Sequence, residues 1–268
     1  MSDTFSFVLS RWSGWLPGVR THAEWRAWHE QGALPEQGGP APDISFVPAL
    51  LRRRCSAATR AALAAARAAA GEGYAHLPSL FASRHGEAET TLEILKTLAR
   101  QELVSPTDFS LSVHNAASGL YSISSSNRSR STAIAARERT FTAALLEIGC
   151  QLDDETPALL AVISDEALPE LYRPACTEDS PFFALALLAC RPGTTAGPVL
   201  TVATNPGAAE APSGREPRAI SFMRWLWGAS DEPLSWSERG VRWTLTRSGE
   251  VAECFEPVGA PPIRPGTS

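Results

Sequence analysis

The chain has 268 residues, of which 44% are hydrophobic and 20% are charged, and its formal net charge is -5 at pH 7. This composition is typical of a globular protein with a sizeable core, arranged as one large domain or two small ones. The negative charge argues against nucleic acid as a bulk partner, because phosphate binding needs a basic face. No apolar run approaches the roughly 20 residues that span a bilayer, and the N-terminus lacks the basic segment of a secretory signal.

The cysteines are odd in number and lack the C-x-x-C spacing of zinc and redox sites. They are Cys55, Cys150, Cys176, Cys190 and Cys254. Cys55, Cys150 and Cys190 have apolar or helical surroundings in the sequence. This favours core thiols in a reducing cytoplasm over a disulfide framework. We therefore expect a cytoplasmic protein with no metal site and no cofactor.

The first segment, Phe5–Asp43, is rich in tryptophan. The pattern predicts a strand over FSFVLS, a turn at Leu16–Gly18, a helix over Thr21–Gln31 that Thr21 could cap, and a Gly- and Pro-rich loop over 32–43. The tryptophans are expected in a core or a subunit interface rather than on an open binding surface. They are Trp12, Trp15, Trp25 and Trp28.

The stretch Phe46–Ala70 contains the clearest helix, from about Ser56 onward, because alanine has the highest helix propensity. Gly71 and Gly73 end it. Its arginines could hold an anionic partner, although a basic helix surface is usually only solvated. They are Arg52, Arg53, Arg54, Arg60 and Arg67.

A strand over Leu77–Ala82, a polar turn over Ser83–Glu87 and a helix over Ala88–Leu103 follow. The turn contains His85 among charged neighbours, which favours a structural hydrogen bond over catalysis.

The stretch 106–125 predicts a strand, a tight turn and a helix. Phe109, Leu111 and Val113 alternate with serines, as in a strand with one buried face. Asn115 is a good N-cap for the helix that follows. The turn 114–117 would then lie at a helix N-terminus, where backbone N–H groups are free.

The same alternation of elements continues to the end of the chain. The patterns predict a short buried strand over 131–136, a helix from Phe141 to Ile148, and a strand over 158–164 that is buried on both faces. Charges in the turn 137–139 are expected to be solvated. Further strands are predicted over 182–190, 198–204 and 241–247, and a helix over 220–227. The stretch 205–217 is expected to be flexible and the tail from Pro257 disordered. Strands mixed with helices in this way indicate an α/β fold.

Five segments, in this order, resemble the N-terminal half of β-ketoacyl synthases, which have the thiolase fold. The segments are FVPALLRRRCS with its Ala-rich helix, LFASRHGE, SPTDFSLSVHNAASGLYSI, STAIAARERTFTAALLE and LLAVISDEALPELY. The sequence most closely resembles chain-length-factor-like subunits encoded with aryl polyene and related type II fatty acid or polyketide pathways. The resemblance implies a buried mixed sheet flanked by helices. We expect a synthase-like domain over 1–205, a short extension packed on it over 206–256, and a disordered tail over 257–268.

The resemblance also implies that the synthase nucleophile is replaced. In condensing synthases a strand similar to FSLSV leads into an elbow that bears cysteine, and HNAASG aligned with that elbow places Ala116 at this position. The histidine pair of the synthases comes from the C-terminal half, whereas the last histidine here is His114. With neither an activated nucleophile nor a histidine pair, we expect no catalytic residue.

The leading hypothesis is a non-catalytic, chain-length-factor-like subunit that forms a heterodimer with an active β-ketoacyl synthase and shapes its acyl pocket. In the fold that the sequence resembles, two subunits pair through the strand before the elbow, here the predicted strand 109–113. Action of His114 or Asn115 on a malonyl thioester is less favoured than a structural role, in which His114 makes a hydrogen bond within the turn or contacts the partner, Asn115 caps the helix and Ala116 packs. The residues expected at the acyl pocket or interface are Phe109, Leu111, Val113, His114, Asn115, Ala116, Gly119, Leu120 and Tyr121.

Two alternatives remain open. The chain could act alone on acyl thioesters as a decarboxylase, acyltransferase or thioesterase, with Cys176 as the thiol and His85 or His114 as its base. It could also be a scaffold that docks an acidic acyl carrier protein through the arginines of 52–67 and 128–139.

Overall fold

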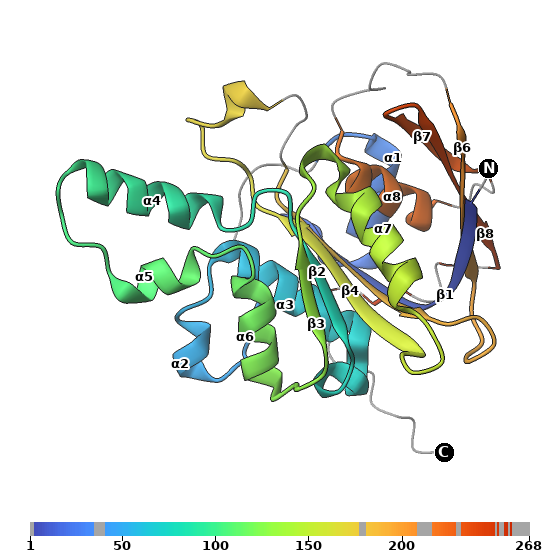
Figure 1. Ribbon diagram of the computed structural model, residues 1–268, viewed down its shortest axis with the longest axis horizontal. Coiled ribbons are helices and arrows are strands. Elements are labelled where there is room, and N and C mark those ends of the chain that lie inside the picture. Colours follow the sequence, from blue (N-terminus) through green and yellow to red (C-terminus); the bar gives the residue numbers. More distant parts are fainter. Residues whose placement is uncertain are drawn as a thin grey trace.

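The computed structural model describes residues 3–34, 41–176, 181–207, 216–228, 232–249, 251, 255–256 and 258. A mixed sheet of eight strands runs through this part of the chain, in the order β3-β2-β4-β5-β1-β6-β8-β7 (Figure 1). The strands are β1 (Asp3–Trp15), β2 (Ser79–Ala82), β3 (Ser131–Ile134), β4 (Ala158–Asp165), β5 (Phe183–Cys190), β6 (Val199–Pro206), β7 (Leu234–Glu238) and β8 (Val241–Ser248). β2 is parallel to β3 and β4, and the other pairs are antiparallel.

Helices cover both faces of the sheet and make a three-layer structure. Along β4, Leu159, Ala161 and Ile163 belong to one core cluster and Leu160 and Val162 to the other, so the strand is buried on both sides, as predicted. One cluster includes residues of α1 (His22–Gln31), α7 (Thr140–Gln151) and α8 (Arg218–Trp227). The opposite cluster includes residues of α3 (Ala57–Ala70) and α6 (Ala116–Ser125).

Several local predictions are confirmed. Thr21 caps α1 in a full capping box with Glu24, and Ser56 caps α3. Gly71 is the C-cap of α3 and begins the short η1 (Gly71–Ala75). All four N-terminal tryptophans lie in the core.

The cysteine predictions are only partly right. Cys55 and Cys190 are buried free thiols, but Cys150 is exposed, because it lies on the solvent side of α7. Other predictions lie outside the described residues. These are the location of Cys254, most of the flexible stretch (208–215), part of the Gly- and Pro-rich loop (35–40), and the tail over 259–268.

The predicted strand at 109–113 is wrong. Residues 106–111 form the short helix α5 (Pro106–Leu111), which begins with Ser105 as N-cap and Pro106 in its first turn. Phe109 and Val113 are exposed, so their alternation with serine does not mark a buried strand face. The predicted strand at 131–136 exists as β3, but it is an edge strand and is only partly buried.

α4 (Ala88–Ala99) and α5 extend away from the sheet, at the left of Figure 1. We call residues 88–113 the arm. Ala88 and Leu92 are the buried residues of α4, and α5 has none. The other short helices are α2 (Ala49–Arg52), η2 (Arg137–Arg139) and η3 (Arg173–Ala175). Within the described residues, we find no helix of the length and apolarity needed to cross a membrane.

Candidate functional site

The carboxyl ends of three parallel strands meet at one edge of the sheet. β2 leads into the turn 83–87, β3 leads into the turn 135–139, and β4 ends at Asp165. Such an edge is where α/β folds place ligand-binding groups, because the loops that follow neighbouring strands converge there. We therefore take this edge as the candidate site.

A strand, a tight turn and a helix meet at this edge. The sequence predicts the same arrangement, but over residues 106–125. β3 ends at Ile134, η2 follows, and α7 begins at Thr140. Arg137 has a φ of 55°, in the left-handed region that a non-glycine residue seldom adopts. The Thr140 hydroxyl holds this corner, since it accepts a hydrogen bond from Ala136 N (3.0 Å) and donates one to Arg137 O (2.7 Å).

The sequence prediction put the corner at His114–Ala117, where a helix and not a strand precedes α6. That Ala116 stands at the position of the nucleophile stays a prediction. The strand on which this prediction was based does not exist, because residues 106–111 are helical. The true corner had a signal in the sequence, because a predicted strand and a predicted helix flank 137–139. Its residues 136–139 are Ala, Arg, Glu and Arg, so this corner also presents no thiol or hydroxyl.

Asp165 fixes the turn after β2. Its Oδ1 accepts hydrogen bonds from Ser83 Oγ (2.8 Å), Arg84 N (2.8 Å) and His85 N (3.0 Å). Burial raises the pKa of this carboxyl to about 6, against the effect of the three donors, which lower it. The carboxylate therefore ties the end of β4 to the end of β2.

Glu166 and Glu87 fix the start of the arm in the same way. Glu166 is buried and accepts a hydrogen bond from Glu89 N (2.8 Å) in the first turn of α4. Burial raises the pKa of Glu166 to about 7, and repulsion from Glu87, Glu89 and Asp165 adds to this rise. Glu87 is also buried, and its Oε1 accepts hydrogen bonds from Thr59 Oγ1 (2.7 Å) and Ser56 Oγ (3.0 Å) of α3.

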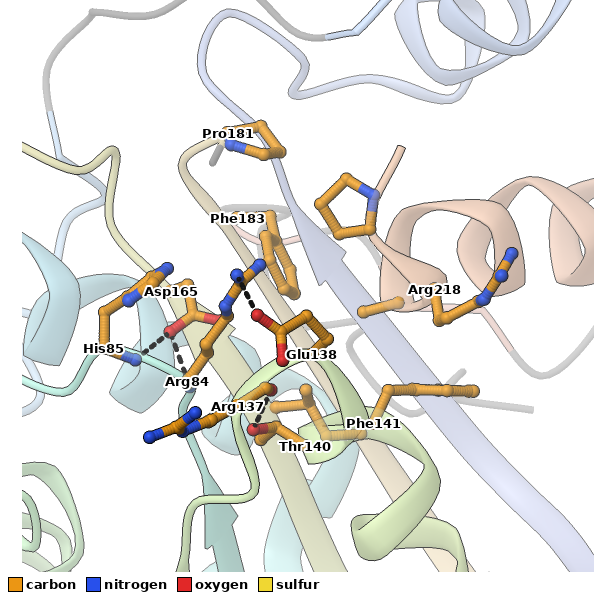
Figure 2. A pocket seen from close by; sticks show the side chains of 13 residues that line it. Arg84, His85, Arg137, Glu138, Thr140, Phe141, Asp165, Pro181, Phe183 and Arg218 are labelled. Carbon is orange, nitrogen blue, oxygen red and sulfur yellow. Dashed lines mark hydrogen bonds and ion pairs between the residues drawn. The ribbon is translucent and has the colours of Figure 1, made fainter. Parts of the chain in front are cut away.

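A small cavity lies beside the corner (Figure 2). Its volume is about 30 Å³, which is room for roughly two water molecules. An ion pair of Arg84 with Glu138 (3.0 Å) lies at the cavity, and Phe141, Ile163 and Phe183 supply apolar walls. His85 lines the cavity with a buried Nε2 that has no hydrogen-bond partner among the described residues. Burial lowers the pKa of this imidazole to about 4, so His85 is neutral at pH 7.

The predicted acyl-pocket residues divide into three groups. Leu111, Ala116 and Leu120 line one groove of about 240 Å³. Tyr121 is fully buried, and its hydroxyl donates to the carbonyl of Tyr74, while a Cβ added at Gly119 would meet nothing within 4 Å. The exposed residues are Phe109, Val113, His114 and Asn115.

His114 and Asn115 behave differently from one another. His114 Nε2 lies 2.9 Å from the carbonyl oxygen of Ser83, which is a structural hydrogen bond to the turn after β2. Asn115 occupies the N-cap position of α6, but its side chain makes no capping hydrogen bond.

The predicted docking arginines are only partly available. Arg53 and Arg54 line the same groove as Leu111, Ala116 and Leu120. Arg60 instead donates to the carbonyl oxygens of Cys55 and Arg52, and Arg67 donates to that of Gly71. The structure therefore places two of the five arginines next to the apolar groove residues.

The cysteine alternative gains no support from the geometry. Cys176 is partly exposed at the end of η3, and none of the four cysteines in the described part of the chain lines the cavity that contains His85. In the described part of the chain, no three His, Cys, Asp or Glu side chains are grouped to hold a metal ion.

The sheet order and the helices on both faces define a thiolase-like fold. The family described as "Beta-ketoacyl synthase, N-terminal domain" matches residues 25–244, which is most of the chain. The chain therefore belongs to the β-ketoacyl synthase N-terminal domain family. A comparison with curated proteins gave no match.

Solved structures share this fold. A chain of the complex titled "Ketosynthase (ApeO) in Complex with its Chain Length Factor (ApeC) from Xenorhabdus doucetiae" matches with a TM-score of 0.76 and 24% identity, over 90% of this chain and 99% of that chain. The ishigamide ketosynthase/chain length factor matches with a TM-score of 0.59 and 16% identity, over 77% and 68%. A β-ketoacyl synthase from Burkholderia phymatum STM815 matches with 0.56 and 12%, over 70% and 59%.

Proposed function

We propose that this protein is a non-catalytic, chain-length-factor-like subunit that pairs with an active β-ketoacyl-[acyl-carrier-protein] synthase and shapes its acyl pocket. The products would belong to the polyene, fatty acid or polyketide class. The match to a chain of a ketosynthase–chain length factor complex supports this pairing.

The corner between β3 and α7 is the observation that carries the proposal. A nucleophile for condensation has to stand at such a corner, where the following helix stabilises a thiolate. Residues 136–139 offer no thiol or hydroxyl there, and the Thr140 hydroxyl is engaged on both sides by the backbone. The adjacent cavity of about 30 Å³ is too small for an acyl chain. These features support a role beside a catalytic partner.

The free edge of β3 is the proposed pairing line. The carbonyl oxygen of Arg130 accepts a hydrogen bond from Ser79 N of β2, and that of Ile134 accepts one from Ser83 N, directly after β2. Because successive residues of a strand point their backbone groups to opposite sides, the N–H groups of Ser131 and Ala133 face away from β2. An exposed strand edge of this kind is a template for a strand of another chain.

Co-expression with a β-ketoacyl synthase from the same organism tests the proposal. We expect a 1:1 complex in size exclusion and a product length that the synthase alone does not give. Ala133→Pro should weaken the complex, because it removes an outward N–H group and leaves the pairing with β2 intact. Ala133→Val keeps the N–H group and is the matched control. A monomer beside a synthase that is fully active alone would refute the proposed function.

Docking of an acyl carrier protein is the second part of the proposal. The groove that contains Ala116 is lined by Arg53 and Arg54 and also by the acidic Glu87 and Asp108. An acidic carrier that binds the two arginines would deliver its acyl group next to apolar residues. Loss of carrier binding in Arg53→Glu/Arg54→Glu, measured by titration at low and high salt, is the expected result. Equal carrier binding by this variant and the wild type would exclude the groove.

A further inference from the structure

The arm is weakly supported by the rest of the chain. α5 has six residues and buries none of them, and α4 buries only Ala88 and Leu92. Helices shorter than about 12–15 residues are marginal in water unless tertiary packing stabilises them. Elements with few buried contacts open at a lower free energy than the core of the same protein. The position of the arm therefore depends on the contacts at its two ends.

The two ends of the arm are held by hydrogen bonds of different kinds. At the start, the buried Glu166 accepts a hydrogen bond from Glu89 N (2.8 Å) in the first turn of α4. At the other end, His114 Nε2 lies 2.9 Å from the carbonyl oxygen of Ser83. An imidazole can donate this hydrogen bond in its neutral form and in its charged form. The contact of His114 therefore works in either protonation state, whereas that of Glu166 involves a carboxyl group buried among other carboxyl groups.

The surroundings of Glu166 favour its neutral form. Burial raises the pKa of its carboxyl to about 7, and repulsion from three other carboxyl groups adds to the rise. These groups are Glu87, Glu89 and Asp165. Two further titratable groups lie in the turn 83–87: Arg84 lowers the pKa of Asp165, and His85 is neutral at pH 7. Glu166 therefore changes its charge near neutral pH.

Release of α4 would relieve the repulsion on an ionised Glu166. Glu87 is held in place by α3, since its Oε1 accepts hydrogen bonds from Thr59 Oγ1 (2.7 Å) and Ser56 Oγ (3.0 Å). Asp165 is held by its three donors in the turn after β2. The start of α4 is the weakly held side of this cluster, and its departure would admit water to the Glu166 carboxylate.

We infer that the contact of Glu166 with Glu89 N is a proton-dependent latch for the arm. When Glu166 is protonated, the latch is closed and α4 lies against the rest of the protein. When Glu166 is ionised, the first turn of α4 detaches and exposes Ala88 and Leu92, while the arm stays attached through His114. The latch is a property of this chain alone and does not depend on the proposed function.

The direction of the effect follows from the linkage between opening and ionisation. The pKa of Glu166 is about 7 in the closed arm, and its ordinary value of 4.5 applies in the open arm. The closed arm is therefore fully favoured below about pH 4.5, and this advantage is lost as the pH rises through about 7. The ratio of open to closed arm should rise roughly tenfold between about pH 6 and about pH 8, since most of the change is complete just above the higher pKa.

Amide hydrogen exchange in the full-length chain tests the latch, with each rate corrected for the intrinsic effect of pH. The reference is α3, most of whose residues are buried. We expect the α4 amides of the wild type to exchange through a local opening that low urea does not change, and their protection to fall roughly tenfold between about pH 6 and about pH 8. Glu166→Gln should remove this fall. Glu102→Gln changes an exposed carboxyl of the arm and, as the matched control, should behave like the wild type.

Three results would overturn the latch. The first is a protection of α4 that equals that of α3 and falls with urea in the same way, because α4 would then open only with the whole protein. The second is the same pH dependence in Glu166→Gln and the wild type. If Glu166→Gln does not fold, Glu89→Gln replaces it and should move the midpoint of the pH dependence to lower pH, because one repelling carboxyl is removed. An unchanged midpoint in Glu89→Gln is the third.

Discussion

Glu166 is a buried carboxylate whose charged neighbours include three other carboxylates. Its pKa is about 7 in the folded protein, mainly because of burial, and 4.5 is the ordinary value. A folded-state pKa above the unfolded value means that folding favours the protonated form. The contribution of Glu166 to stability is therefore complete below about pH 4.5 and is lost as the pH rises through about 7. Asp165, with a pKa of about 6, acts in the same direction at lower pH.

The expected consequence is a steeper loss of stability with pH in the wild type than in Glu166→Gln. The glutamine keeps a carbonyl oxygen for Glu89 N–H but cannot ionise. At about pH 8 the variant should be more stable by up to roughly 3 kcal/mol, and the difference should shrink towards about pH 5. Urea unfolding across this range measures it, with Glu170→Gln at an exposed position as the control. Parallel pH curves for Glu166→Gln and the wild type would contradict the assignment.

The sequence identified some residues of the candidate site but not their arrangement. For His85 the sequence favours a structural hydrogen bond over catalysis, but in the structure its Nε2 has no hydrogen-bond partner among the described residues, and only its backbone N–H bonds to Asp165. Asp165 was not singled out, because the contact joins residues 80 positions apart and exists only through the pairing of β2 with β4. The sequence predicts a solvated charged turn at 137–139, between a strand and a helix, and gives no sign that this turn is the corner at the site. The alternation before 114–117, the N-cap signal of Asn115 and the resemblance to the synthase elbow favoured 114–117 instead.

At the scale of the helix, two glycines allow a matched comparison. A Cβ at Gly119 in α6 would meet nothing within 4 Å, whereas a Cβ at Gly149 in α7 would lie 2.6 Å from Phe5 Cδ2. Alanine is favoured over glycine inside a helix by about 0.5–1 kcal/mol. We expect Gly119→Ala to raise the free energy of unfolding by about that amount. Gly149→Ala should lower it by roughly 1–3 kcal/mol, because of overpacking.

Denaturant unfolding of both glycine variants is the measurement. A gain of stability in Gly149→Ala equal to that in Gly119→Ala would mean that the Phe5 ring moves aside without cost.

Elements with strong local signals were predictable, and those fixed by long-range pairing were less so. The capped, alanine-rich α3 and the continuous apolar run of β4 are where the sequence placed them. The predicted strand at 109–113 was wrong because it rested on the alternation of Phe109, Leu111 and Val113 alone, whereas Ser105 and Pro106 begin a helix. β7 was missed, because a short strand with alternating serines is hard to distinguish from a loop until its partner β8 is known.

For the whole molecule, the sheet continues through the predicted domain boundary at 205–206. β8 pairs with β6 along its length, and β7 pairs with the other side of β8 at the edge of the sheet. Phe222 of α8 and Trp236 of β7 pack against Phe141 of α7, at ring distances of 5.1 and 6.0 Å. The boundary stays a prediction, but the residues after it complete the core on the α7 side.

A chain that ends at Gly207 should therefore fail to fold cooperatively. Removal of α8, β7 and β8 would expose the buried face of α7 and one side of β6. We expect the truncated protein to lose the near-ultraviolet circular dichroism signal and the sharp thermal transition of the full chain, and to bind a hydrophobic dye. A sharp transition with a retained near-ultraviolet signal would show that residues 1–207 are an independent unit.

The two ends of the arm lie side by side, and this determines which changes in its length and sequence the fold can accept. The chain leaves the body at the turn 83–87 and returns at His114, whose Nε2 lies 2.9 Å from the Ser83 carbonyl oxygen. A segment whose ends nearly touch can be shortened, lengthened or exchanged without moving the scaffold, since closing a loop of different length changes the free energy only slowly. The arm should therefore tolerate insertions, deletions and replacement without loss of the fold.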